Sequence, residues 1–180
     1  MGVKSKNEKN WYTPADVDIK IKDTAYLSMD LSYGALKGER SKTSGLGQHC
    51  KDQNVLLNCQ KALEASRSAG IFVVHVRVAF RPGFPEYGEV CSHFWAKIRE
   101  SGAYIEGSPG AKICEEVAPK ENEPVITKHT VDPFIYTDLD KLLRVHGISY
   151  LILTGIATSN IIEGTVRAGT DRGYVTIVLE

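Results

Sequence analysis

The feature that most constrains the fold is a regular alternation of short apolar runs with segments of helical periodicity. The apolar runs are nearly continuous, which is typical of strands buried on both faces of a parallel sheet. Strands separated by helices favour right-handed crossovers, so we predict an α/β protein with three α/β/α layers and a doubly wound, mainly parallel sheet. The expected strands are 24–30, 71–78, 124–128, 149–154 and 174–179, and the expected helices are 49–69, 137–146 and 159–172.

Two segments interrupt this alternation. Residues 32–48 are rich in Gly, Ser and Lys, which predicts a loop or a mobile flap. Residues 79–123 lack a sustained period and are expected to hold only short helices. A long irregular insertion usually builds a site or contacts a partner. Its aromatic side chains, among them Phe94 and Trp95, either wall a pocket or fill a small local core.

Composition narrows the classes of function. The chain has 180 residues with 22 Lys and Arg against 22 Asp and Glu, so its formal net charge is zero. This balance offers no basic surface for nucleic acid or for an anionic membrane, and a small-molecule partner is expected instead. The four cysteines form no CxxC pair, and the first 20 residues contain no apolar signal segment. We therefore expect a cytoplasmic protein with free thiols.

The domain organisation follows from the same pass along the chain. Residues 1–23 are polar and are expected to form an N-terminal arm, and residues 24–180 a single α/β domain. The sequence stops just after an apolar strand, which predicts that a C-terminal part of the domain is missing.

Candidate site residues lie where the predicted strands end. In open parallel sheets, sites form at the carboxyl ends of the strands, and these ends carry Asp30, Arg77, Lys128 and the turn that begins at Gly155. Each residue also has a structural interpretation. Asp30 can cap a loop, Lys128 can be a solvated surface residue, and Arg77 can pair with a carboxylate at the sheet edge.

Four segments, in order, carry a family resemblance: AYLSMDLSYG, HVRVAFRPG, PVITKHTVDPF and LTGIATSNIIEGTVRAGTDRGY. Together they resemble the isochorismatase-like hydrolases, also called cysteine hydrolases, from about residue 24 to the end. The resemblance implies a Rossmann-like fold, a homodimer or homotetramer, and a catalytic triad of Asp, Lys and Cys. Asp30 and Lys128 match the first two members. Ile156 and Ala157 match a cis-peptide turn whose backbone N–H groups form an oxyanion hole.

The match breaks at the third member of the triad. In the family pattern G-[VIL]-A-T-x-x-C, counted from Gly155, the cysteine position is Ile161. An alkyl side chain cannot form an acyl-enzyme, so the covalent route to amide hydrolysis loses its nucleophile. The segment AFRPGFPEYG also lacks the Asp-x-His of metal-binding relatives, so we expect no metal and no cofactor. The tentative pocket residues are Arg77, Phe94, Trp95, Phe134 and Thr158.

Two functions remain open. The first is a hydrolase that cleaves a small ether or amide with the Asp30–Lys128 pair and without a covalent cysteine intermediate. Isochorismatases, which carry Gly at the cysteine position and cleave a vinyl ether, give a precedent for this chemistry. In vinyl-ether cleavage Asp30 must hold a proton, which requires burial that offsets the charge of Lys128. If Asp30 is ionised, it serves better as a general base. The second is an inactive ligand-binding or oligomer-forming protein of the same fold.

Other readings of the sequence are weaker. A dinucleotide-binding module is disfavoured because no G-x-G-x-x-G follows the first strand. Thr158 or Ser159 can replace the thiol as nucleophile, although hydroxyls at a helix start are more often caps. His75 is expected to be a hydrogen-bonded core residue. His129 is the better base candidate, although strand alternation points it away from Lys128.

Overall fold

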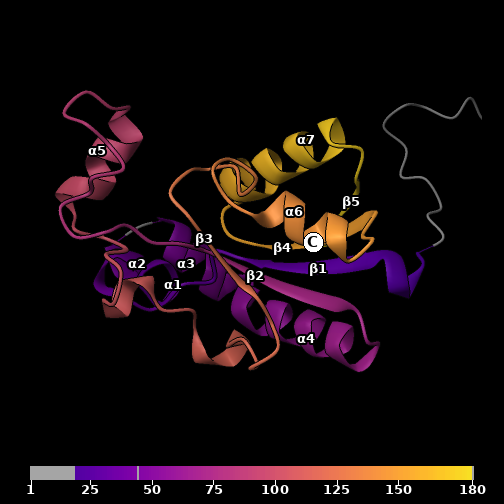
Figure 1. The fold of residues 1–180 in the computed structure, drawn as a ribbon. Helices are drawn as coiled ribbons and strands as arrows, with labels where there is room; N and C mark the ends of the chain where they lie inside the picture. Colours follow the sequence, from indigo (N-terminus) through magenta and orange to yellow (C-terminus); the bar gives the residue numbers. More distant parts are fainter. Residues whose placement is uncertain (1–18, 44, 180) are drawn as a thin grey trace, which may run out of the picture.

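The computed structural model describes residues 19–43 and 45–179 and contains a five-stranded parallel sheet of order β3-β2-β1-β4-β5 (Figure 1). All five predicted strands are confirmed, each within two residues of its expected ends. Residues 1–18 of the predicted arm lie outside the described ranges. The strands are β1 (Thr24–Met29), β2 (Phe72–Val78), β3 (Val125–Lys128), β4 (Tyr150–Gly155) and β5 (Val175–Val178).

Helices cover both faces of this sheet, which confirms the three-layer arrangement. Figure 1 shows α4 (Val55–Ser68) on one face and α6 (Leu139–Val145) with α7 (Glu163–Asp171) on the other. Each interface has its own apolar core: Leu63 of α4 packs with Tyr26, whereas Leu143 of α6 packs with Leu151. No helix within the described ranges is both long and apolar enough to span a bilayer.

The prediction of a loop over residues 32–48 was wrong. This stretch forms α1 (Tyr33–Leu36), α2 (Glu39–Thr43) and the start of α3 (Gly45–Asp52). Each of the three helices is short, and Leu36 and Cys50 are buried against the α4 side of the sheet. Tertiary packing thus stabilises helices that the Gly-rich and Ser-rich sequence would not form alone.

The predicted helix over 49–69 was also wrong in its continuity. Asn54 has a φ of 51°, in the left-handed region, and separates α3 from α4. Asparagine adopts this conformation more readily than most residues, so the chain changes direction there. The helix ends at Ser68, one residue before its expected end, and Gly70 follows with a φ of 72°.

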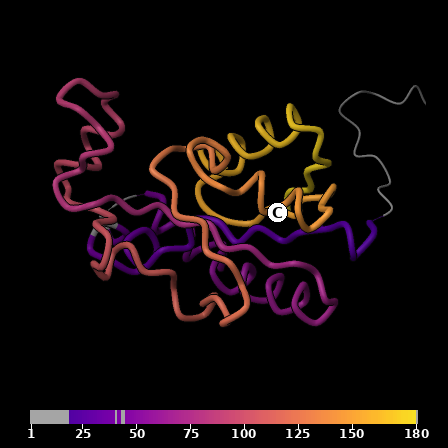
Figure 2. Tube along the Cα trace, viewed as in Figure 1, coloured from indigo at the N-terminus to yellow at the C-terminus, as the bar shows by residue number. Residues whose placement is uncertain are grey.

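The irregular insertion over 79–123 is confirmed, with α5 (His93–Glu100) as its one α-helix in the described residues. Figure 2 shows this stretch leaving the sheet as an excursion and returning to β3. Phe80, Phe84 and Ile98 form a separate small core within it. The remaining short elements are 3-10 helices at Ile21–Asp23, Pro109–Ala111 and Glu115–Val117, and a π-helix, η4 (Thr158–Ile162), that leads into α7.

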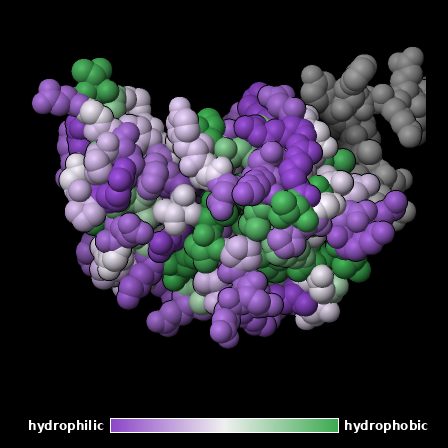
Figure 3. Space-filling view, in the orientation of Figure 1, coloured by the Kyte–Doolittle hydropathy of each residue, from purple (hydrophilic) through white to green (hydrophobic). Residues whose placement is uncertain are grey.

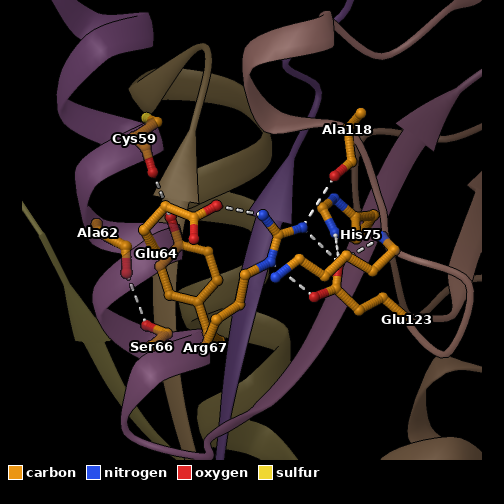
Figure 4. Close-up of polar contacts among 10 residues, drawn as sticks. Cys59, Ala62, Glu64, Ser66, Arg67, His75, Ala118 and Glu123 are labelled. Atoms are coloured by element: carbon orange, nitrogen blue, oxygen red, sulfur yellow. Dashed lines mark hydrogen bonds and ion pairs between the residues drawn. The ribbon is translucent and has the colours of Figure 1, made fainter.

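A buried polar network joins α4, β2 and the segment before β3 (Figure 4). Arg67 makes two bonds to the carboxylate of Glu123, at 2.7 Å from Nε and 2.6 Å from Nη2. His75, fully buried, lies with its Nε2 2.9 Å from the same carboxylate. The expectation that His75 is a hydrogen-bonded core residue is therefore confirmed. Although burial alone would raise the pKa of Glu123, its hydrogen bonds, chiefly that from Arg67, lower it to about 2.

This network predicts an acid-sensitive contribution to stability. Because the folded-state pKa of Glu123 lies below its unfolded value, its contribution is complete above about pH 4.5 and is lost as the pH falls toward 2. We expect Glu123→Gln to lower the free energy of unfolding by about 3 kcal/mol at pH 7, measured by urea denaturation, because Arg67 then loses a buried partner. The difference from the unmodified protein should shrink between pH 4.5 and 2.

The matched control is Glu64→Gln. Glu64 also contacts Arg67, at 2.6 Å, but its side chain is 53% exposed, so about 0.5 kcal/mol is expected. Equal losses for the two variants would contradict the assignment of the network to Glu123.

Candidate functional site

The register of the sheet brings two charged side chains together at its carboxyl edge. Met29 pairs with Val76, and Val78 pairs with Lys128, so the ends of β1 and β3 flank the end of β2. Asp30 follows β1 with a φ of 54°, and its N–H donates to the Val76 carbonyl at 2.9 Å. From these positions Lys128 Nζ reaches Asp30 Oδ2 at 2.9 Å.

Burial governs the electrostatics of this pair. The side chains of Lys128 and Asp30 are only 3% and 14% exposed. Loss of hydration raises the pKa of Asp30, and Lys128 together with the Val78 backbone lowers it by less than burial raises it. The Oδ1 atom is shielded from solvent, so the exposed part of the carboxylate lies on the side of Oδ2. The result is a carboxyl that holds its proton more strongly than an ordinary aspartate.

The ammonium group of Lys128 is held from a second direction. Its Nζ also donates to the carbonyl of Thr130 at 2.9 Å. These two contacts use two of its three N–H bonds. The third has no acceptor within the described ranges and can donate to a bound molecule.

The pair opens into a pocket of about 230 Å³ between the sheet edge, α5 and the start of η4. Figure 3 shows hydrophobic side chains between the lobe that carries α5 and the body of the sheet. Most of the lining is apolar. The lining residues are Asp30, Ser32, Ala35, Leu46, Val78, Phe94, Trp95, Ile98, Tyr104, Lys128, Val131, Ile156, Ala157, Asn160 and Ile161.

The turn after β4 forms one side of the pocket. Gly155 has a φ of 148°, and a Cβ there would lie 2.1 Å from the Met29 carbonyl oxygen, so only glycine fits. The peptide bond between Ile156 and Ala157 is cis. The N–H of Ile156 donates to Met29 at 3.3 Å. Of these two amides, only that of Ala157 lacks an acceptor in the described part of the chain.

Ile161 lies in the pocket lining and is 1% exposed. No sulfur atom accompanies it, because none of the four cysteines belongs to the lining. Cys50, Cys59 and Cys114 are buried elsewhere, and burial raises the pKa of each thiol, that of Cys114 to about 11.

Three of the tentative pocket residues do not line the pocket. Phe134 belongs instead to the core on the α6–α7 face, where it stacks with Tyr174. Thr158 is exposed at the start of η4. Arg77 donates to Thr127 Oγ1 at 3.0 Å and lies 3.7 Å from Glu106, which matches its structural interpretation.

His129 also lies outside the lining. Its Nδ1 is 2.6 Å from the Ala79 carbonyl, as the alternation of the strand indicated. Sequence reasoning missed Ser32 and Asn160, two uncharged hydrogen-bonding side chains of the pocket lining. The sequence signal that could have identified them is their position, since Ser32 lies close to Asp30 and Asn160 lies next to Ile161.

The residues present do not favour a metal ion at this edge. No group of three or more His, Cys, Asp or Glu side chains with metal-binding geometry occurs within residues 19–43 and 45–179. The carboxylate of Asp30 already faces a lysine, which would compete with a cation.

Comparison with known proteins identifies the domain type. The family model for the isochorismatase domain matches residues 25–180. The chain is 32% identical over 137 residues to the ureidoacrylate amidohydrolase of Yersinia enterocolitica, a match that covers 70% of this chain and 60% of that protein. It is 31% identical over 118 residues to the maleamate amidohydrolase of Pseudomonas putida, covering 65% and 54%. The matches thus span little more than half the length of these relatives.

Solved structures agree on the fold. A cysteine hydrolase from Pseudomonas syringae superposes with a TM-score of 0.77 at 23% identity, over 89% of this chain and 72% of that one. An isochorismatase-type hydrolase from Oleispira antarctica gives a TM-score of 0.67 at 28% identity, over 90% and 75%.

The burial of the thiols predicts their reactivity. In the native protein at pH 8, a disulfide reagent such as DTNB should modify the partly exposed Cys91 first. Cys114 should react on the order of a hundredfold more slowly, because its raised pKa leaves little thiolate. Mass mapping of the modified peptides checks this order. If the thiol at position 50, 59 or 114 reacted as fast as that of Cys91, this would contradict the burial that we find for these three side chains.

Proposed function

Because this chain belongs to the isochorismatase family, we propose that it is a hydrolase that cleaves a small organic molecule at an amide or ether bond. Asp30 and Lys128 carry out the proton transfers, and no covalent cysteine intermediate forms. The names of the relatives, both amidohydrolases, support the amide as the first bond to test. A homodimer or homotetramer remains a prediction from the family resemblance, and a cytoplasmic location remains a prediction from the sequence of the first 20 residues and the cysteine pattern.

The observation that carries this proposal is the buried Asp30–Lys128 contact at the edge of an apolar pocket. A carboxyl group transfers protons most efficiently when its pKa lies near the working pH. Burial moves the pKa of Asp30 in that direction. The geometry also supplies donors for a developing oxyanion, namely the third N–H of Lys128 and the amide of Ala157.

For an amide, ionised Asp30 acts as a general base. It removes a proton from water while the water oxygen attacks the carbonyl carbon, and the oxyanion forms opposite Lys128. The tetrahedral species then collapses as the amine departs with the proton returned by Asp30. Water and amide are consumed, carboxylic acid and amine are released, and Asp30 is again ionised.

For a vinyl ether, protonated Asp30 acts as the acid. It transfers its proton to the methylene carbon, and water captures the resulting oxocarbenium ion. The hemiketal that forms then loses the alcohol and becomes a ketone, and the proton from water returns to Asp30. The two routes need opposite protonation states of the same side chain.

Ile161 separates both routes from thiol chemistry. Its alkyl group supplies no electron pair, so the only attacking group that the proposal needs is water. A second candidate function rests on the same residue: a protein that binds a ligand in this pocket and does not convert it. Conversion of a bound ligand to product distinguishes the hydrolase from the binding protein.

We expect Asp30→Asn to lower the rate of hydrolysis by about 10²–10⁴-fold, because the asparagine side chain can act neither as the general base nor as the general acid. Product formation from benzamide, maleamate and isochorismate is measured by chromatography. Alkylation of the cysteines with iodoacetamide is the matched control and should leave the rate within about twofold. Loss of activity on alkylation alone would refute water as the direct nucleophile. Ligands that bind but never turn over would favour the binding protein.

The pH dependence of the rate distinguishes the two routes. Amide hydrolysis should fall as the pH drops through the pKa of Asp30, because the base becomes protonated. Ether cleavage should fall as the pH rises through the same pKa. Because burial raises this pKa, either limb should lie above about pH 3.9, the ordinary value for aspartate. A limb at or below that value would contradict the assignment to Asp30.

A further inference from the structure

We infer that the pocket selects an uncharged substrate, whose flat apolar body lies against Trp95 and Phe94 while its polar end meets Asp30 and Lys128. This inference rests on the proposed function only for the place where reaction occurs. The selectivity itself is a matter of binding and can be measured without turnover.

The first observation that supports an uncharged substrate is the charge of the pocket lining. Among the described lining residues, Asp30 and Lys128 are the only two with formal charges, and their heavy atoms lie 2.9 Å apart. When Asp30 is ionised, the positive and negative charges therefore cancel over short distances. A carboxylate that approaches Lys128 also approaches the carboxylate of Asp30, so it gains little from the field of the pocket.

Arg77 and Arg81 do not change this balance, because both already have acidic partners. Arg81 Nε lies 2.7 Å from Glu86, and Arg77 lies 3.7 Å from Glu106. Neither belongs to the lining. The pocket thus lacks, in the described part of the chain, the Arg–carboxylate fork that proteins use to bind organic acids.

The second observation is the aromatic wall of the pocket, formed by Trp95 and Phe94. Trp95 stacks on Tyr87, with ring centroids 5.0 Å apart, and meets Phe80 edge-on at 5.7 Å. These contacts fix its orientation before any ligand enters. Phe94, 43% exposed, lies edge-on to Trp95 at 4.7 Å. A rigid aromatic wall of this kind favours planar, apolar ligands.

The polar groups beside the charged pair match an uncharged partner. Asn160 presents a side-chain amide with both donors and an acceptor, and Ser32 adds a hydroxyl. Such groups recognise a carboxamide, an ester or a hydroxyl without net charge. Ile161, 1% exposed, adds an alkyl group to the lining, which offers no hydrogen bond to a second polar substituent.

The test compares three ligands by isothermal titration calorimetry with the full chain at pH 8 and low salt. Benzamide is flat and uncharged, benzoate has the same shape with a negative charge, and cyclohexanecarboxamide is uncharged and not flat. We expect benzamide to bind about tenfold more tightly than benzoate and about threefold more tightly than cyclohexanecarboxamide. Benzoate binding as tightly as benzamide, or no binding by any of the three, would overturn the inference.

Two variants assign the effect to its residues. Asn160→Arg adds a cation to the lining from an exposed position and should reverse the preference in favour of benzoate. Trp95→Ala should weaken benzamide by about threefold to tenfold, whereas Trp95→Phe, which keeps a flat ring, should change it by less than about twofold. An unchanged preference in Asn160→Arg, with the fold retained by circular dichroism, would contradict a charge-balanced pocket.

Failure here and failure of the proposed function give different results. Selective binding of benzamide without any turnover of carboxamides or enol ethers would uphold the inference and refute the hydrolase. Turnover of anionic substrates alone, abolished by Asp30→Asn, would do the reverse.

Discussion

The contact between Asp30 and Lys128 is the interaction on which the site depends. Taking both charges out of water is expensive, and their mutual attraction offsets this only when the geometry is good. The parallel sheet provides that geometry, because β1 and β3 end on either side of β2 and hold the two backbones at fixed spacing. Hydrogen bonds from the Asp30 amide to Val76 and from Lys128 to Thr130 hold both residues in place.

The same burial sets what the pair can do. In water, a lysine at 2.9 Å would keep an aspartate ionised over the whole useful pH range. Behind an apolar wall, desolvation outweighs the lysine and raises the pKa of Asp30. This supplies a group able to give and accept protons next to a pocket whose described lining contains no sulfur. In the function that we propose, the alkyl group of Ile161 and the proton-transfer role of Asp30 are linked, because water then serves as the nucleophile.

The sequence was sufficient to predict what depends on local pattern. The five strands and the two helical layers follow from hydrophobic period. Strand ends and the family resemblance indicated Asp30 and Lys128 as candidates, but no sequence rule places their side chains 2.9 Å apart. Residues 32–48 were mispredicted because α1, α2 and α3 depend on burial of Leu36 and Cys50, a long-range effect that composition does not reveal. Phe134 was placed in the pocket for a similar reason, since its neighbour Tyr174 is forty residues away.

The pocket lining was the hardest part to predict. Phe94 and Trp95 were identified as aromatic residues of a long insertion, but their position over the sheet edge depends on how that insertion returns to β3. Asn160 and Ser32 carry no motif of their own. They matter because of their neighbours, which only the three-dimensional arrangement reveals.

The ionisation of Asp30 tests the central claim most directly and needs no substrate. Carboxyl carbons of the labelled protein are followed by NMR from pH 3 to pH 9, and the signal of Asp30 is assigned by its absence in Asp30→Asn. We predict one aspartate carboxyl that titrates above the ordinary value of about 3.9. Titration of Asp30 at or below that value would show that Lys128 outweighs burial, and it would contradict the role in proton transfer that we assign to this residue.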